Sequence, residues 1–238
     1  MSDFYVGYGG SMPSRHKKAV SLFVWVSLVC SLLLAMLWLY HMKPLEESHF
    51  EFGITKNFEG ELVWEPVPML RVSRPGSVAV SHYLLVNEGK FGLEKSYQSM
   101  AGKQVKVNGS LIYRNGRTMI EVRSCTRTGE GKLQAIPSSD RRVSLVGEIV
   151  DSKCYLGVMN PGDKRGHQAC AVRCISGGIP PMLMVGNEAY ILVGPAGTPL
   201  NREILDRIAV PVTVTGIART QGEWQVLETS PTQITLVR

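Results

Sequence analysis

The stretch VKVNGSLIYRNGRTMIEV, residues 105–122, combines two runs of alternating apolar and polar residues with an Asn-Gly pair between them. Alternation with a period of two places successive side chains on opposite faces of a β-strand. Asn-Gly is typical of a two-residue hairpin turn, because both positions adopt positive φ angles. The stretch therefore predicts a β-hairpin that turns at Asn115 and Gly116.

Parts of this pattern recur later in the chain. VKVNG at 105–109 recurs as VTVTG at 212–216, and YLLV at 83–86 recurs as YILV at 190–193. In both places the tyrosine precedes the final glycine by 26 residues. Similarity that keeps its spacing indicates two copies of one structural unit. A unit of about 70–100 residues with several short strands and a closing hairpin resembles an OB-fold, with an SH3-like barrel as the alternative.

Residues 19–40 are 22 positions without a charged side chain. As a helix they span about 33 Å, enough to cross a hydrocarbon core of roughly 30 Å. Arg15, Lys17 and Lys18 precede this segment, so the positive-inside rule predicts a cytoplasmic N-terminus and an extracytoplasmic remainder. A cleaved signal peptide is the alternative, but its apolar region is only about 7–15 residues long and ends in a small-x-small site. We therefore expect an uncleaved, single-pass signal anchor.

The expected fold class is all-β with one N-terminal transmembrane helix and two tandem OB-like β-barrels, the second carrying a helical Cys/His insertion. The expected divisions are a cytoplasmic tail at 1–18, the transmembrane signal anchor at 19–41, a juxtamembrane linker at 42–56, a first barrel at 57–128, a linker at 129–141, and a second barrel at 142–238 with its insertion at 151–178.

The composition excludes several classes of protein. The chain has 238 residues, of which 44% are hydrophobic and 19% charged, and its net charge is +6. It is too apolar for a disordered protein and too polar for a multi-span transporter. The mild positive balance suggests contact with lipid headgroups or an acidic partner. The sequence contains no Ser/His/Asp arrangement, phosphate loop or Cys-x-x-Cys-His motif, which favours a non-enzymatic role.

The two copies differ by one insertion. The Pro-Met-Leu motif begins 8 residues after the glycine of the first Gly-Glu strand in copy one, but 34 residues after it in copy two. The additional residues contain the candidate metal ligands Cys154, His167, Cys170 and Cys174, which have no counterpart in copy one. Because a barrel that folds without the insertion does not need it for its core, we expect the function to lie in the insertion.

The spacing of these four residues predicts a metal site. At about 100° per residue, His167, Cys170 and Cys174 project from one face of a helix, toward a loop that holds Cys154. Three thiolates and one imidazole form a complete tetrahedral shell for zinc or an iron–sulfur cluster, and copper(I) is a further candidate.

Two other interpretations of the cysteines remain open. Thiols in an oxidising compartment usually pair, and Cys125 with the three insertion cysteines permits three pairings. A disulfide from Cys154 to Cys170 or Cys174 would leave a purely structural assembly module. Alternatively, Cys170 and Cys174 would serve a thiol–disulfide oxidoreductase.

Other candidate residues are weaker. His49 and His82 are lone histidines, and Cys30 lies within the membrane span, where packing is the expected role. Four aromatic residues could form a stacking face for nucleic acid on an OB barrel: Tyr83, Tyr113, Tyr155 and Trp224. Since the expected topology places the barrels away from nucleic acid, we expect these rings in the core or its rim.

The run GEIVDSKCYLGVM at 147–159, followed by HQACAVRC at 167–174, resembles a signature of uncharacterised bacterial membrane-anchored proteins. The resemblance implies a bacterial inner membrane location with the bulk of the chain in the periplasm. The chain is also loosely similar to the haem chaperone of cytochrome c maturation, although that family's haem-attaching histidine motif has no match here. We expect an accessory protein that presents a metal centre to a membrane redox complex or its assembly, with the cell membrane and other membrane proteins as partners, and no nucleic acid.

Overall fold

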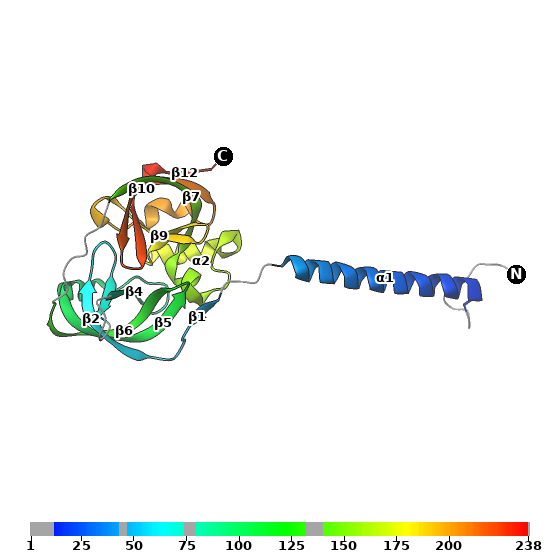
Figure 1. Cartoon of the computed structure of the whole chain (residues 1–238), viewed down its shortest axis with the longest axis horizontal. Helices are drawn as coiled ribbons and strands as arrows, with labels where there is room; N and C mark the ends of the chain where they lie inside the picture. The colour runs from blue at the N-terminus through cyan, green and yellow to red at the C-terminus, as the bar shows by residue number, and fades with distance from the viewer. Residues whose placement is uncertain (1–11, 43–46, 74–79, 132–139, 238) are drawn as a thin grey trace. The chain divides into compact units, whose positions relative to one another are not determined.

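The computed structural model describes residues 12–42, 47–73, 80–131 and 140–237 (Figure 1). The chain divides into two compact units, with the boundary between Leu45 and Glu46. The first unit contains one helix, and the second contains all the strands.

The helix of the first unit is α1, Ser14–His41. Within the described residues it is the one helix long and apolar enough to cross a membrane. The structure thus confirms an apolar N-terminal helix that could be a membrane anchor or a signal sequence. The helix begins at Ser14, so the basic residues Arg15, Lys17 and Lys18 belong to its first turns.

The first sheet closes into a five-stranded barrel. Its order is β1-β5-β2-β3-β4-β6, and β5 also pairs with β6. β4 and β6 run parallel, whereas the other pairs are antiparallel. The strands are β1 Ser48–Phe50, β2 Lys56–Val63, β3 Met69–Ser73, β4 Val80–Asn87, β5 Lys103–Arg114 and β6 Arg117–Glu130. β1 lies in the segment expected to be a juxtamembrane linker and adds a strand beside β5.

The second sheet follows the same order of pairings. β7, β8 and β9 are successive antiparallel neighbours, β9 pairs in parallel with β11, and β10 pairs with both β11 and β7. A short β12 pairs with β10. The strands are β7 Arg141–Asp151, β8 Pro181–Val185, β9 Glu188–Val193, β10 Pro211–Gln221, β11 Trp224–Glu228 and β12 Ile234–Leu236.

The repeated glycines occupy equivalent positions in the two sheets. A Cβ atom on Gly109 would lie 2.3 Å from the carbonyl oxygen of Glu121, and one on Gly216 would lie 2.2 Å from that of Glu228. Both strands therefore approach their neighbours too closely for any other residue. This close approach gives a physical reason for the glycine that ends each Val-x-Val-x-Gly run.

The two groups of strands pack directly against each other. β4 buries both of its faces: Leu85 points into the first sheet's own core, while Leu84 and Val86 belong to a separate cluster shared with the second group. We call this cluster the inter-barrel core. It comprises Val67, Met69, Leu84, Val86, Ile112, Met119, Val150, Cys154, Tyr155, Leu156, Cys174, Ile179, Met182, Ala189, Ile191, Val193, Trp224 and Val226.

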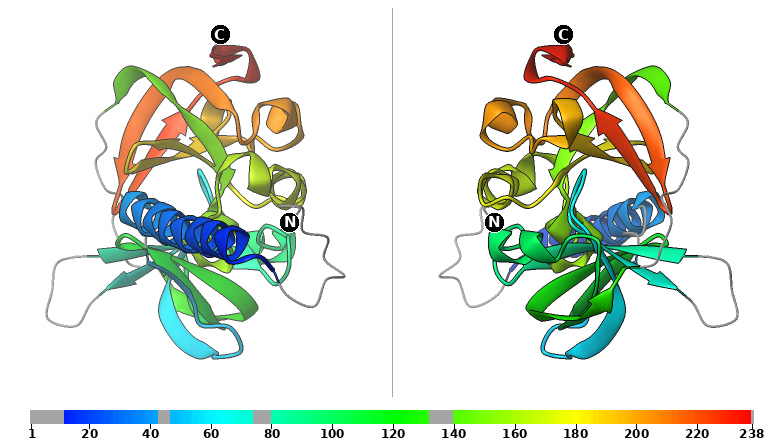
Figure 2. Two further views of the ribbon diagram at one scale, coloured as in Figure 1. Left: turned by 90° about the vertical axis from the view of Figure 1, so that its right-hand side faces the viewer. Right: turned by 90° about the vertical axis from the view of Figure 1, so that its left-hand side faces the viewer.

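The insertion contributes to the inter-barrel core. It folds into a π-helical turn, η2 Cys154–Val158, and a helix, α2 Lys164–Ser176. α2, drawn in yellow-green, lies near the boundary between the two groups of strands (Figures 1 and 2). Leu156 is completely buried there. We expected the second group of strands not to need the insertion for its own core. This is wrong, because Ala171 and Ile175 of α2 lie in that core, and other side chains of the insertion fill the space between the two sheets.

Short 3-10 helices complete the second unit: η1 Lys95–Met100, η3 Pro195–Gly197, η4 Arg202–Arg207 and η5 Pro231–Gln233. The expected linker at 129–141 is partly occupied by strands, since β6 extends to Glu130 and β7 begins at Arg141.

Candidate metal centre

The three cysteines of the insertion meet at one point. The Sγ atom of Cys154 lies 3.8 Å from that of Cys170 and 3.9 Å from that of Cys174. Cys154 and Cys174 are almost fully buried, with 3% and 2% of their surface exposed, whereas Cys170 is half-buried. These separations are far longer than an S–S bond of about 2.05 Å, and all five cysteines are free thiols.

A second group of ligands adjoins the first. Asp151, at the end of β7, is completely buried, and its Oδ2 atom lies 2.9 Å from Nε2 of His167. Its Oδ1 atom accepts a 2.8 Å hydrogen bond from the backbone N–H of Cys154. Asp151, Cys154 and His167 form one candidate ligand group, and Cys154, Cys170 and Cys174 form another. The predicted ligands are therefore distributed over two groups that share Cys154, and both are positioned to hold a metal ion.

The sulfurs differ in their affinity for protons. The hydrogen bond between Cys154 and Cys174 is the largest influence on both residues: it raises the pKa of the Cys154 thiol and lowers the pKa of Cys174. Burial and the nearby charge of Asp151 raise the Cys154 pKa further. Cys154 therefore holds its proton more tightly than an ordinary thiol, and Cys174 releases its proton more readily. A thiolate is the form that binds a metal.

Lys90 supplies a positive charge to the sulfurs. This residue follows β4, so it comes from the first group of strands, and its Nζ atom lies 2.7 Å from Sγ of Cys170 and 4.0 Å from Sγ of Cys174. The hydrogen bond to Cys170 raises the pKa of the Lys90 ammonium, and the charges of Cys174 and Cys170 add to this effect. Sequence reasoning missed Lys90, because no short-range pattern links it to a helix 80 residues later.

The loop that carries Lys90 is held against the insertion by Lys153. The Nζ atom of Lys153 donates hydrogen bonds of 2.9 and 2.6 Å to the carbonyl oxygens of Asn87 and Gly89, and it forms an ion pair with Glu121. The Lys153 side chain is only 3% exposed. A buried ammonium is tolerated only where such partners replace its lost hydration. Lys153 thus connects the insertion to β4 and β6.

Glycines allow the same loop to approach the end of α2. The N–H of Gly92 donates a 3.0 Å hydrogen bond to the carbonyl oxygen of Gly177, the C-cap of the helix. A Cβ atom on Gly177 would lie 1.9 Å from the carbonyl oxygen of Lys90. A larger residue would therefore push the Lys90 loop away from the sulfurs.

The weaker candidate histidines lie outside both ligand groups. His82 packs against the second group of strands, where its carbonyl oxygen accepts a 2.8 Å hydrogen bond from the indole N–H of Trp224. The ring of His49 stacks near that of Tyr113, with centroids 5.2 Å apart.

The four aromatic residues do not share one stacking face. Trp224 is fully buried in the inter-barrel core, Tyr83 packs edge-on against Phe58, and the guanidinium of Arg114 lies 4.3 Å from the ring centroid of Tyr155. These contacts agree with the expected packing roles.

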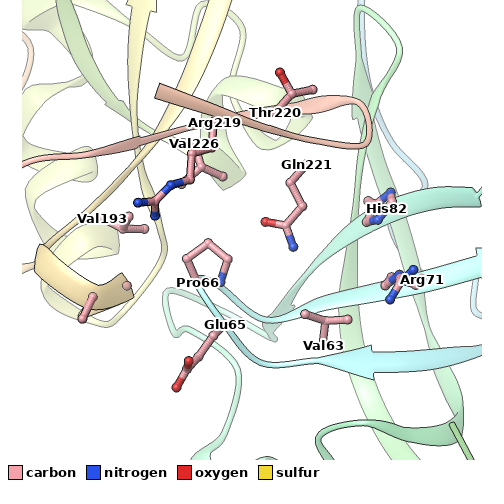
Figure 3. A pocket seen from close by; sticks show the side chains of 12 residues that line it. Val63, Glu65, Pro66, Arg71, His82, Val193, Arg219, Thr220, Gln221 and Val226 are labelled. Carbon is pink, nitrogen blue, oxygen red and sulfur yellow. The ribbon is translucent and has the colours of Figure 1, made fainter. Parts of the chain in front are cut away.

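A cavity of about 400 Å³ lies between the two groups of strands at another position (Figure 3). Arg71 and His82 approach it from one side, and Arg219 and Gln221 from the other. None of the four predicted ligands of the insertion lines this cavity. Cys125 is likewise remote, buried in the core of the first barrel, and burial raises its pKa to about 11.

The described fold and site define a mostly β protein with one apolar N-terminal helix and a cysteine cluster positioned to hold a metal ion. No protein-family model, no curated protein and no solved structure matches the chain.

Proposed function

We propose that the protein is a membrane-anchored, extracytoplasmic accessory protein whose Cys154, Cys170 and Cys174 bind a single metal ion. The observation that carries this proposal is the size of the sulfur triangle. Two thiolates bound at about 2.3 Å to one tetrahedral zinc ion are about 3.8 Å apart. The Sγ atom of Cys154 lies 3.8 Å from that of Cys170 and 3.9 Å from that of Cys174.

The triangle favours one ion over an iron–sulfur cluster. In an iron–sulfur cluster three cysteine ligands bind at least two different iron atoms, so the three sulfurs are spread more widely than the ligands of one ion. Zinc is the ion we propose, and copper(I), which also prefers thiolates, is the competing outcome. His167 supplies either a fourth ligand or, through Asp151, orientation of the ligand shell.

The arrangement suits an ion that is passed on to a partner. Cys170 is half-buried and Lys90 beside it is exposed, so a partner could approach a bound ion from this side, and zinc sites with an open position exchange that ligand. Together with an apolar N-terminal helix, this supports a role beside a membrane redox complex or in its assembly. We also propose that the two sheets are OB-like barrels derived from one duplicated unit, since both follow the same order of strand pairings.

Metal analysis of the full-length protein tests the proposal. Protein purified in detergent under reducing conditions is expected to contain close to one equivalent of zinc. Cys154→Ser, Cys170→Ser and Cys174→Ser should each lose most of this metal. Cys125→Ser is the matched control, because this thiol lies in the core of the first barrel, and it should retain the metal. Equal metal content in all four variants, or a metal-free wild type that does not bind added zinc, would refute the proposal.

Cobalt substitution identifies the ligands. A Co²⁺-loaded sample should show intense sulfur-to-metal absorption in the near ultraviolet, whose strength falls in each of the three variants. An iron-containing, visibly coloured protein would instead indicate a cluster.

A further inference from the structure

The amine of Lys90 and the sulfur of Cys170 lie closer together than the sulfurs of Cys154 and Cys170 do. Their separation is 2.7 Å, against 3.8 Å for the two sulfurs. Ordinary N–H···O hydrogen bonds measure about 2.9–3.0 Å, and a bond to the larger sulfur atom should be longer still. A nitrogen and a sulfur at 2.7 Å have the separation that one bridging oxygen atom spans. We propose that Lys90 and Cys170 form a covalent N–O–S crosslink when the protein is oxidised.

The surrounding structure fixes both partners of this crosslink. Lys153 holds the backbone on the N-terminal side of Lys90 through the carbonyl oxygens of Asn87 and Gly89. On the other side, the hydrogen bond from Gly92 to Gly177 joins the loop to α2. Cys170 lies on that same helix. The short contact is therefore set by backbone attachments on both sides of Lys90.

Exposure favours Cys170 over the other two cysteines. Cys154 and Cys174 are 3% and 2% exposed, whereas Cys170 is half-buried and Lys90 is exposed. A small oxidant from solution reaches Cys170 first, because oxidation of cysteine follows accessibility and thiolate character.

Hydrogen peroxide is the proposed oxidant, and two molecules of it balance the reaction. In the first step the sulfur of Cys170 attacks peroxide, an S–O bond forms, the O–O bond breaks and water leaves, which gives a sulfenic acid. In the second step the Lys90 ammonium releases one proton to water, and another peroxide then removes two electrons and two hydrogens, one from the S–OH group and one from the resulting amine. The N–O bond forms and two further waters leave. Sulfur and nitrogen are oxidised, and both peroxides are reduced.

The crosslink does not depend on the proposed metal function. Metal binding concerns the reduced sulfurs, whereas the crosslink requires only Cys170, Lys90 and an oxidant. If both occur, oxidation removes one sulfur ligand and releases the ion. The bridge would then act as a redox switch for the site.

Intact-mass spectrometry of the full-length protein tests the crosslink. Reduced, chelator-treated protein is exposed to hydrogen peroxide, and its remaining thiols are alkylated. The expected product is about 14 Da heavier before alkylation, since it gains one oxygen and loses two hydrogens, and it has one fewer reactive thiol. Digestion should give a joined peptide that contains Lys90 and Cys170, and a thiol reductant should restore the original mass.

Three variants decide the assignment. Lys90→Arg and Cys170→Ser should not form the product, whereas Lys95→Arg, which changes a nearby exposed lysine, should form it as the wild type does. A product only about 16 or 32 Da heavier, or one about 2 Da lighter from a disulfide, would overturn the proposal. Metal binding by the reduced protein without the crosslink refutes the crosslink alone. The crosslink in a protein that binds no metal refutes the proposed function alone.

Discussion

Replacing Lys153 by methionine tests how strongly the insertion is attached to the first barrel. Methionine keeps most of the apolar stem but removes the ammonium. The ion pair with Glu121 and the two hydrogen bonds to Asn87 and Gly89 are lost together. All these groups lie between the insertion and the strands β4 and β6, so the substitution weakens that contact without opening a large cavity.

The expected loss is large because Glu121 stays behind. Its side chain is only 13% exposed and would lose its ion-pair partner. Removing one member of a buried ion pair costs about 3–5 kcal/mol of unfolding free energy. For a unit of this size such a loss lowers the melting temperature by roughly 10 °C. The double variant Lys153→Met with Glu121→Gln removes the unpaired charge and should recover about 2 kcal/mol or more.

Pulse proteolysis of the full-length protein in detergent, over a range of urea concentrations, measures these free energies. The control is Lys164→Met, which removes an exposed lysine at the start of α2 and should change stability by less than about 0.5 kcal/mol. A loss below about 1 kcal/mol for Lys153→Met, or a double variant no more stable than the single one, would refute this account of the attachment.

Three further predictions concern other parts of the molecule. Burial lowers the pKa of His82 below its ordinary value of 6.5. Between the lowered pKa of the folded state and about 6.5, the unfolded chain binds more protons than the folded chain does. The contribution of His82 to stability is therefore fully present above about pH 6.5 and is lost as the pH falls. His82→Gln should flatten this pH dependence in urea titrations at several pH values. Gly177→Ala should destabilise the protein by about 2 kcal/mol or more, because the added Cβ atom collides with the carbonyl oxygen of Lys90. Gly166→Ala, in α2 with open space around it, should instead stabilise the protein by about 0.5–1 kcal/mol. Similar urea unfolding midpoints for the two variants would contradict this reasoning. Leu28→Arg places a charge near the middle of α1 at a cost of about 3 kcal/mol, and fractionation should show less protein in the membrane; unchanged membrane association would argue against a spanning helix.

Local patterns were sufficient to predict much of the β structure. The expected hairpin at residues 105–122 is confirmed by β5 and β6, which pair up to Arg114 and Arg117. Asn115 and Gly116 have φ angles of 50° and 73°, the positive values that such a turn requires. Turn chemistry and alternation act over a few residues, so a single sequence contains this information.

The site was predictable only in part. Helical spacing correctly placed Cys170 and Cys174 on one face, and it suggested that Cys154 lies opposite. Asp151 stands in the same insertion and could have been considered as a partner of His167. Lys90 could not have been found, since its position follows from the packing of one barrel on the other.

The inter-barrel core was also missed, although the sequence contains a signal for it. YLLV at 83–86 and YILV at 190–193 are continuous apolar runs and not alternating ones, which is typical of strands buried on both faces. Each barrel by itself explains burial of one face. The second apolar face required a partner surface, and that partner is the other group of strands.

If the sulfur triangle binds a metal ion as proposed, its position makes capture of that ion depend on both groups of strands. Its sulfurs belong to the insertion in the second group, but the charge of Lys90 and the attachment of the insertion come from the first barrel. A chain whose first barrel has not folded would lack the Lys90 charge beside the sulfurs and the partners that hold Lys153. Acquisition of the ion would then report that both groups of strands have folded and packed together.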